Sequence, residues 1–356
     1  MARMTRRTFQ QGALGTLAAG AAAPASLAQT GAKAMSDTSG ALVVPAHTIP
    51  VPASLSPEAQ AFLANAGQRI AAMGANAHAA DQGPAAEAAL QFLRPRAAGF
   101  KGRFTEIELA FGAKVYRAIP DSRSTGLGNS AYFDIHGGGF TAGGGEMCQV
   151  LTRLRAMEHG VEVWSVDYRL APQHQYPAAL DDCMAAWREV LKHVPARHVV
   201  LAGSSAGGNL AAALLLRARA EGLAIPAALL LLTPGLDMTG AGDTRQTNKY
   251  HDVNLWGGGG GGPSAYVGTA DPKHPFVSPL FGDFTGGWWP PTLLSSGTRD
   301  LLLSDTVRMH RALRRAGVAA ELHVTEAGPH GGFMGTAPED RELMGEVRRF
   351  CREAWA

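Results

Sequence analysis

A short glycine-flanked turn at residues 203–207 constrains the fold of this chain more than any other stretch. Residues 199–202 read Val-Val-Leu-Ala, which is typical of a fully buried strand, and the turn Gly-Ser-Ser-Ala-Gly follows at once. Residues 209–220 are rich in Ala, Leu and Arg, which predicts a helix. Strand, tight turn and helix form the setting in which a G-x-S-x-G sequence carries a nucleophile, so Ser205 is the candidate.

The small residues around Ser205 have a physical reason. So sharp a turn strains its central residue and leaves little room for neighbouring side chains. It also places the hydroxyl at a helix N-terminus, whose dipole favours developing negative charge. The chain contains 44 glycines, so the five-residue motif alone does not separate a catalytic serine from a glycine-rich turn.

Alternating strands and helices surround this turn. Apolar runs predict strands at 103–110, 113–119, 131–135, 161–166, 198–202, 227–232, 291–296 and 321–325. Helical patterns fall at 146–160, 177–193, 209–220, 304–317 and 338–355. The first two strands alternate apolar and polar residues, as antiparallel edge strands do. This order predicts an α/β fold with a mostly parallel central sheet flanked by helices.

Composition narrows the class of protein. With 356 residues, 46% of them hydrophobic, the chain can bury a large core. A net charge of +2 without a dense Lys/Arg stripe gives no reason to expect a nucleic-acid partner. Cys148, Cys183 and Cys351 are too far apart to suggest a zinc site or a disulfide framework. No later segment is apolar enough to predict stable membrane insertion of the mature chain.

The N-terminal region has a different texture. Residues 1–28 combine Arg6-Arg7, an Ala/Gly-rich apolar run and the small residues Ser26 and Ala28, which are the parts of an export signal of the twin-arginine type. A disordered basic terminus is the alternative. Residues 29–100 read as a linker followed by helices, at 59–73 and 84–93, with Pro57 at the first helical position after Ser56.

A run of three glycines follows the strand at 131–135. His136 precedes Gly137, Gly138 and Gly139, and bare backbone there lets N–H groups point into a cavity, as a tetrahedral oxyanion needs. A phosphate-binding loop is the competing interpretation. It is disfavoured because neither G-x-G-x-x-G nor a terminal G-K-[ST] is present.

An acid and a base follow the last two strands. Asp300 comes just after the strand at 291–296, where a parallel sheet carries catalytic groups, and we prefer it to Asp305, which a helix start explains. His330 lies in a Gly/Pro loop after the last strand. The chain order Ser205, Asp300, His330 is that of α/β-hydrolases and differs from other serine-hydrolase lineages.

With these motifs the chain resembles the hormone-sensitive-lipase-like (bacterial family IV) esterases across about residues 100–355. The matching stretches are 136–140, 167–172, 176–182, 203–208, 278–280, 300–302 and His330. The resemblance implies an α/β-hydrolase core at 101–356, with a helical cap built from the N-terminal helices and an insertion at about 238–275. Ser204 departs from the family's usual Asp or Thr. A run of glycines at 257–262 stands where the family's cap-helix sequence is expected. Two interpretations of this run stay open, a lid loop and a low-complexity insertion.

The resemblance also implies a function. We expect a serine carboxylesterase acting on short- to medium-chain esters, with a catalytic triad of Ser205, Asp300 and His330 and an oxyanion hole from Gly138, Gly139 and Ala206. Neither a metal nor an organic cofactor is expected.

Several alternatives remain open beside this expectation. The same triad could hydrolyse lactones, amides, carbamates or insoluble triglycerides, and a non-catalytic ligand-binding protein is another option. The expected partner is a small-molecule ester, and the expected location is the periplasm of a Gram-negative bacterium or the medium. The oligomeric state, a dimer included, stays open.

Overall fold

The computed structural model describes residues 35–36, 41–44, 46–73, 84–258 and 262–356. The chain divides into two compact units, Met1–Pro50 and Val51–Ala356. In the first, strands β1 (Met35–Ser36) and β2 (Leu42–Val43) pair antiparallel, where the sequence indicated only a linker. The predicted export signal at 1–28 lies outside the described residues.

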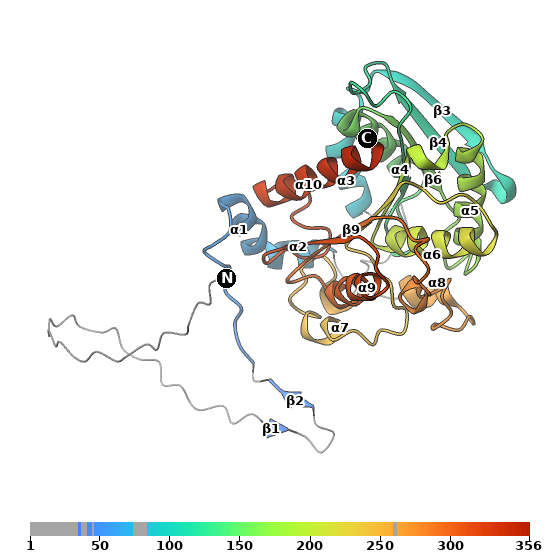
Figure 1. The fold of residues 1–356 in the computed structure, drawn as a ribbon. Helices are drawn as coiled ribbons and strands as arrows, with labels where there is room; N and C mark the ends of the chain where they lie inside the picture. Colours follow the sequence, from blue (N-terminus) through green and yellow to red (C-terminus); the bar gives the residue numbers. More distant parts are fainter. Residues whose placement is uncertain (1–34, 37–40, 45, 74–83, 259–261) are drawn as a thin grey trace, which may run out of the picture. The chain divides into compact units, whose positions relative to one another are not determined.

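One sheet of eight strands organises the second unit (Figure 1). Its spatial order is β10-β9-β8-β7-β5-β6-β4-β3. The strands are β3 (Gly102–Glu108), β4 (Lys114–Pro120), β5 (Ala131–Ile135), β6 (Glu162–Asp167), β7 (Val199–Ser204), β8 (Ala228–Leu232), β9 (Thr292–Gly297) and β10 (Ala320–Thr325). All neighbours from β10 to β6 are parallel, whereas β4 and β3 are antiparallel at one edge. This confirms the predicted mostly parallel α/β-hydrolase sheet.

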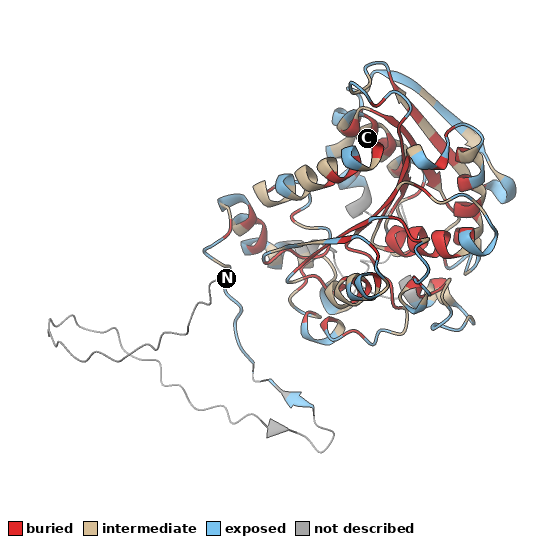
Figure 2. Ribbon diagram, viewed as in Figure 1, coloured by how far each residue is buried: buried red, intermediate tan, exposed pale blue. Residues whose placement is uncertain are grey.

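Helices cover both faces of the sheet because the strands are apolar on both sides. Side chains of β5 alternate: Phe133 and Ile135 pack with one helical layer, and Tyr132 packs with the other. The first layer contains α5 (Ala178–Leu191), α6 (Ala206–Ala220) and α9 (Leu303–Arg315); the second contains α4 (Glu146–His159) and α10 (Pro338–Trp355). Figure 2 shows the resulting buried centre.

Two of the three N-terminal helices of this unit, α1 and α3, contact helices of the second layer. Helix α1 (Pro57–Ala64) starts as predicted, with the Ser56 side chain accepting the Ala59 N–H, and it contacts α10. The expected helix at 59–73 is in fact two, α1 and α2 (Ala66–Met73), because the Asn65 side chain donates to the Ala61 carbonyl oxygen and ends the first. Helix α3 (Pro84–Ala97) contacts α4.

The stretch at 238–275 is mostly irregular, as its sequence indicated. It contains only short helices, α7 (Thr244–Thr247), η3 (Trp256–Gly258) and α8 (Gly262–Val267), and residues 259–261 of the glycine run lie outside the description. The assignment of this stretch and of the N-terminal helices to a cap stays a prediction. All three cysteines are buried and free. Among the described helices, none is long and apolar enough to cross a membrane.

The β7–α6 turn allows no side chain at Gly207. A Cβ atom there would lie far inside van der Waals contact of the carbonyl oxygens of Ile135 and His136. We therefore expect Gly207→Ala to lower the free energy of unfolding by about 1–3 kcal/mol or more, measured by urea denaturation.

The matched control is Gly345→Ala in α10, where a Cβ meets nothing within 4 Å. That change removes a helix-interior glycine without a clash, so it should stabilise by up to about 1 kcal/mol. Equal effects of the two substitutions would contradict the close approach of the backbone at Gly207.

Candidate active site

Ser205 lies at the turn between β7 and α6, at the carboxyl end of the parallel strands. Its backbone has a positive φ, at φ 54° and ψ −117°, a conformation that a non-glycine residue adopts only under local constraint. The constraint includes a hydrogen bond from the Ser205 N–H to the Leu232 carbonyl oxygen (2.9 Å). The strained turn predicted from the sequence is therefore present.

The structure brings His330 and Asp300 to this serine from the two strands at one end of the sheet. The Ser205 hydroxyl lies 2.9 Å from Nε2 of His330. On the other side of the ring, Nδ1 lies 3.1 Å from Oδ1 of Asp300. A proton on Nδ1 leaves Nε2 free to accept the serine proton, so one tautomer of the imidazole satisfies both contacts.

Asp300 is fully buried, and each of its carboxylate oxygens accepts a further hydrogen bond. Ser296 donates its hydroxyl to Oδ2 at 2.7 Å, and the Leu302 N–H donates to Oδ1 at 2.8 Å. The rival acid, Asp305, is buried elsewhere: it accepts the N–H groups of Leu236 and Asp237 and pairs with Arg245. Only Asp300 of the two contacts the histidine.

The charge balance around His330 favours its protonated form. Burial opposes a charged imidazole, but the charge of Asp300 and its hydrogen bond outweigh burial, with a further contribution from Asp252, and together they raise the pKa of His330. A base with a raised pKa accepts a proton more readily.

The glycine run after β5 lies directly against the serine turn. Gly138 has φ 112°, and a Cβ there would collide with the backbone of Ala142, so only glycine fits. Tyr168 stacks on His136 with ring centroids 4.1 Å apart, and its hydroxyl donates to the His136 carbonyl oxygen, which holds the start of the loop.

The amides expected to form the oxyanion hole are available. Within the described part of the chain, the N–H groups of Gly138, Gly139 and Ala206 donate to no protein acceptor. Gly139 and Ala206 line the same small pocket as Ser205, about 50 Å³ in volume. Gly138 precedes Gly139 in the glycine loop but does not line that pocket.

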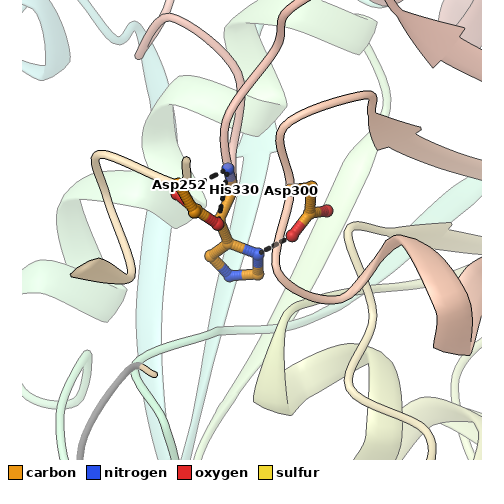
Figure 3. A group of neighbouring side chains, drawn as sticks. All are labelled: Asp252, Asp300 and His330. Atoms are coloured by element: carbon orange, nitrogen blue, oxygen red, sulfur yellow. Dashed lines mark hydrogen bonds and ion pairs between the residues drawn. The ribbon is translucent and has the colours of Figure 1, made fainter. Parts of the chain in front are cut away.

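One buried residue of the site escaped the sequence analysis. Asp252 lies in the irregular stretch, and its carboxylate oxygens are 3.2 and 3.3 Å from the backbone nitrogen of His330 (Figure 3). Its only local signal is an Asx turn, in which Oδ1 accepts the Asn254 N–H at 2.9 Å. Asx turns are common in loops, so the sequence offered no reason to single it out.

Asp252, Asp300 and His330 also bring three potential metal ligands within 4.8 Å of one another. Their donor atoms are already used inside the protein. The Asp252 oxygens accept backbone N–H groups, and Nδ1 of His330 faces Asp300. A cation would have to displace these hydrogen bonds, so the donor set fits a triad with a supporting carboxylate better than a metal centre.

Known proteins resemble this chain in sequence and fold. The family model described as the alpha/beta hydrolase fold matches residues 132–334. An esterase of Acinetobacter venetianus is 30% identical over 224 residues, which cover 62% of this chain and 73% of that protein. The crystal structure of esterase E25 superposes with a TM-score of 0.74 at 31% identity, covering 87% of this chain and 97% of that one.

A second solved structure narrows the family. An esterase described as belonging to the bacterial hormone-sensitive lipase family has a TM-score of 0.69 at 26% identity, and the match covers 85% of this chain and 99% of that one. The same family was indicated by the glycine run, the serine turn and the order of the acid and the base. This chain belongs to the α/β-hydrolase fold family and, within it, to the hormone-sensitive-lipase-like esterases.

Proposed function

We propose that this chain is a serine carboxylesterase that hydrolyses esters of short- to medium-chain carboxylic acids. The observation that carries the proposal is the continuous contact from Ser205 through His330 to Asp300, at 2.9 and 3.1 Å. The esterases among its relatives support the same reaction class. Besides the ester and water, the steps that follow use only groups of this chain.

The reaction begins when the Ser205 hydroxyl attacks the ester carbonyl carbon and passes its proton to Nε2 of His330. Asp300 accepts the hydrogen bond from Nδ1 and stabilises the imidazolium. The N–H groups of Gly138, Gly139 and Ala206 stabilise the oxyanion. Collapse of the tetrahedral intermediate expels the alcohol, which takes the proton from His330.

The acyl-enzyme is then hydrolysed by the same groups. His330 removes a proton from water, the hydroxide attacks the acyl carbon, and the second tetrahedral intermediate releases the carboxylic acid while Ser205 recovers its proton. The pocket at Ser205 has about 50 Å³ of space and is lined by apolar side chains that include Phe140, Met238 and Leu302. So small a pocket favours short acyl chains.

We also propose that the chain is exported with a twin-arginine signal at residues 1–28, removed before the enzyme acts in the periplasm or medium. The paired Arg6 and Arg7 and the small residues that end the apolar run support this.

Ser205→Ala should abolish hydrolysis of 4-nitrophenyl butyrate and labelling by a fluorophosphonate, because both need the hydroxyl. Peptide mapping of the labelled wild-type protein should locate the adduct on Ser205. Ser204→Ala, one residue earlier on the same turn, is the matched control and should keep its labelling. Near-normal turnover in Ser205→Ala would exclude this nucleophile.

Asp300→Asn should reduce kcat roughly 10⁴-fold, since the amide no longer favours the required tautomer or stabilises the imidazolium. Asp305→Asn changes a carboxylate of equal burial outside the triad. Steady-state kinetics on the two purified variants decides which of the two aspartates is the acid. A larger loss of kcat in Asp305→Asn than in Asp300→Asn would mean that Asp305, and not Asp300, is the acid.

Acyl-chain length provides an independent measurement. The small pocket predicts a higher kcat/KM for 4-nitrophenyl butyrate than for the hexadecanoate ester, with no jump in rate when the substrate exceeds its solubility. A jump at the lipid–water interface would instead indicate a lipase.

A further inference from the structure

The loops that carry the acid and the base are both bound by one short segment, residues 248–254, which belongs to neither loop. Asp252 in this segment is fully buried. Its Oδ2 accepts the Leu301 N–H at 2.8 Å, next to the proposed acid, and both of its oxygens face the His330 N–H. Figure 3 shows Asp252 at the backbone nitrogen of His330 and Asp300 at the ring. One carboxylate thus joins the loop after β9 to the loop after β10.

Two asparagines of the same segment complete these contacts. Nδ2 of Asn254 donates to the His330 carbonyl oxygen at 2.7 Å, so both backbone polar groups of His330 are bound from one side. Nδ2 of Asn248 donates to the Asp300 carbonyl oxygen at 2.9 Å. The segment therefore fixes the main chain of acid and base and leaves their side chains to face each other.

The segment is itself anchored. Asp252 Oδ1 accepts the N–H groups of Asn254 and Leu255, at 2.9 and 3.1 Å. Val253 packs in an apolar cluster with Phe62 of α1 and Phe333 of the base loop, whose rings meet edge-on at 5.6 Å. Position 252 is therefore held by both hydrogen bonds and packing.

The hydrogen-bond pattern of Asp252 is that of a carboxylate. Every donor that it meets is a backbone N–H, and a carboxylic acid would place a hydroxyl against one of them. Burial raises the pKa of Asp252, while His330 and the backbone N–H groups oppose that rise. The charged groups that face the imidazole are Asp300, Asp252 and Arg245.

We propose that Asp252 is a positioning residue for the triad. It fixes the acid and base loops relative to each other through their backbones, and its negative charge adds to that of Asp300 in stabilising the imidazolium of His330. The ligand atoms of the three residues lie within 4.8 Å of one another, close enough for a strong Coulombic effect in a buried site. This inference rests on the proposed esterase function. Asp252 acts through His330 and does not contact the substrate.

The test is Asp252→Asn, which keeps the shape, removes the charge and turns an amide N–H toward backbone donors. We expect kcat to fall about 10- to 100-fold with little change in KM, because only the geometry of the triad is disturbed. The acid limb of the kcat/KM profile should move to lower pH, because the imidazolium loses a negative neighbour and the pKa of His330 falls. Active-site titration corrects each rate for the fraction of competent enzyme.

Two further variants make the result decisive. Asp252→Glu keeps the charge but displaces the loops, so we expect a lower kcat with the midpoint close to that of the wild type. Asp182→Asn is the matched control: Asp182 is also buried and accepts a backbone N–H, that of Arg169, but it is not among the charged groups that act on His330, so the midpoint should not move.

An unchanged kcat and midpoint in Asp252→Asn would overturn the proposal, and so would the same shift in Asp182→Asn. Should Asp252→Asn not fold, Asp252→Glu decides: wild-type kcat in that variant would overturn the positioning role. Inactive wild-type protein would instead count against the esterase function, so the two failures remain distinct.

Discussion

The backbone of α6 approaches the end of β5 so closely at Gly207 that the serine turn and the glycine loop form one packed unit. The carbonyl oxygens that exclude a side chain at Gly207 belong to Ile135 and His136, the residues that lead into the glycines. Ser205 keeps a strained backbone because this rigid surrounding leaves it no relaxed alternative. The hydroxyl and the free amides of Gly139 and Ala206 consequently share one pocket.

Strand order then decides what can reach that pocket. β7, β8, β9 and β10 are parallel neighbours, so the segments that follow them meet at one edge of the sheet. The base comes from the outermost of these strands and has to extend past the ends of β9 and β8 to reach Ser205. A loop that spans such a distance needs support beyond its own strand. Residues 248–254 supply it through hydrogen bonds to the backbone of both loops.

Much of the fold could be predicted because its signals are local. The apolar runs of β5 and β8, the glycine-flanked turn and the pattern of α10 each depend on neighbouring residues, and the expected elements agree with the observed ones to within a few positions. The break between α1 and α2 was missed, since Asn65 ends the first helix by a side-chain hydrogen bond that the apolar pattern does not reveal. The candidate triad was accessible because each member follows a strand in a recognisable order.

The sequence by itself determined the alternation of strands and helices, the strained turn at Ser205 and the candidacy of Asp300 and His330, because local chemistry and chain order encode these features. Only the tertiary structure decided that Asp300 rather than Asp305 faces His330, and that Asp252 lies behind both loops. An aspartate in an irregular stretch acquires its role from the backbone N–H groups that meet it. Those groups come from residues 49 and 78 positions away along the chain, a proximity that no local pattern can encode.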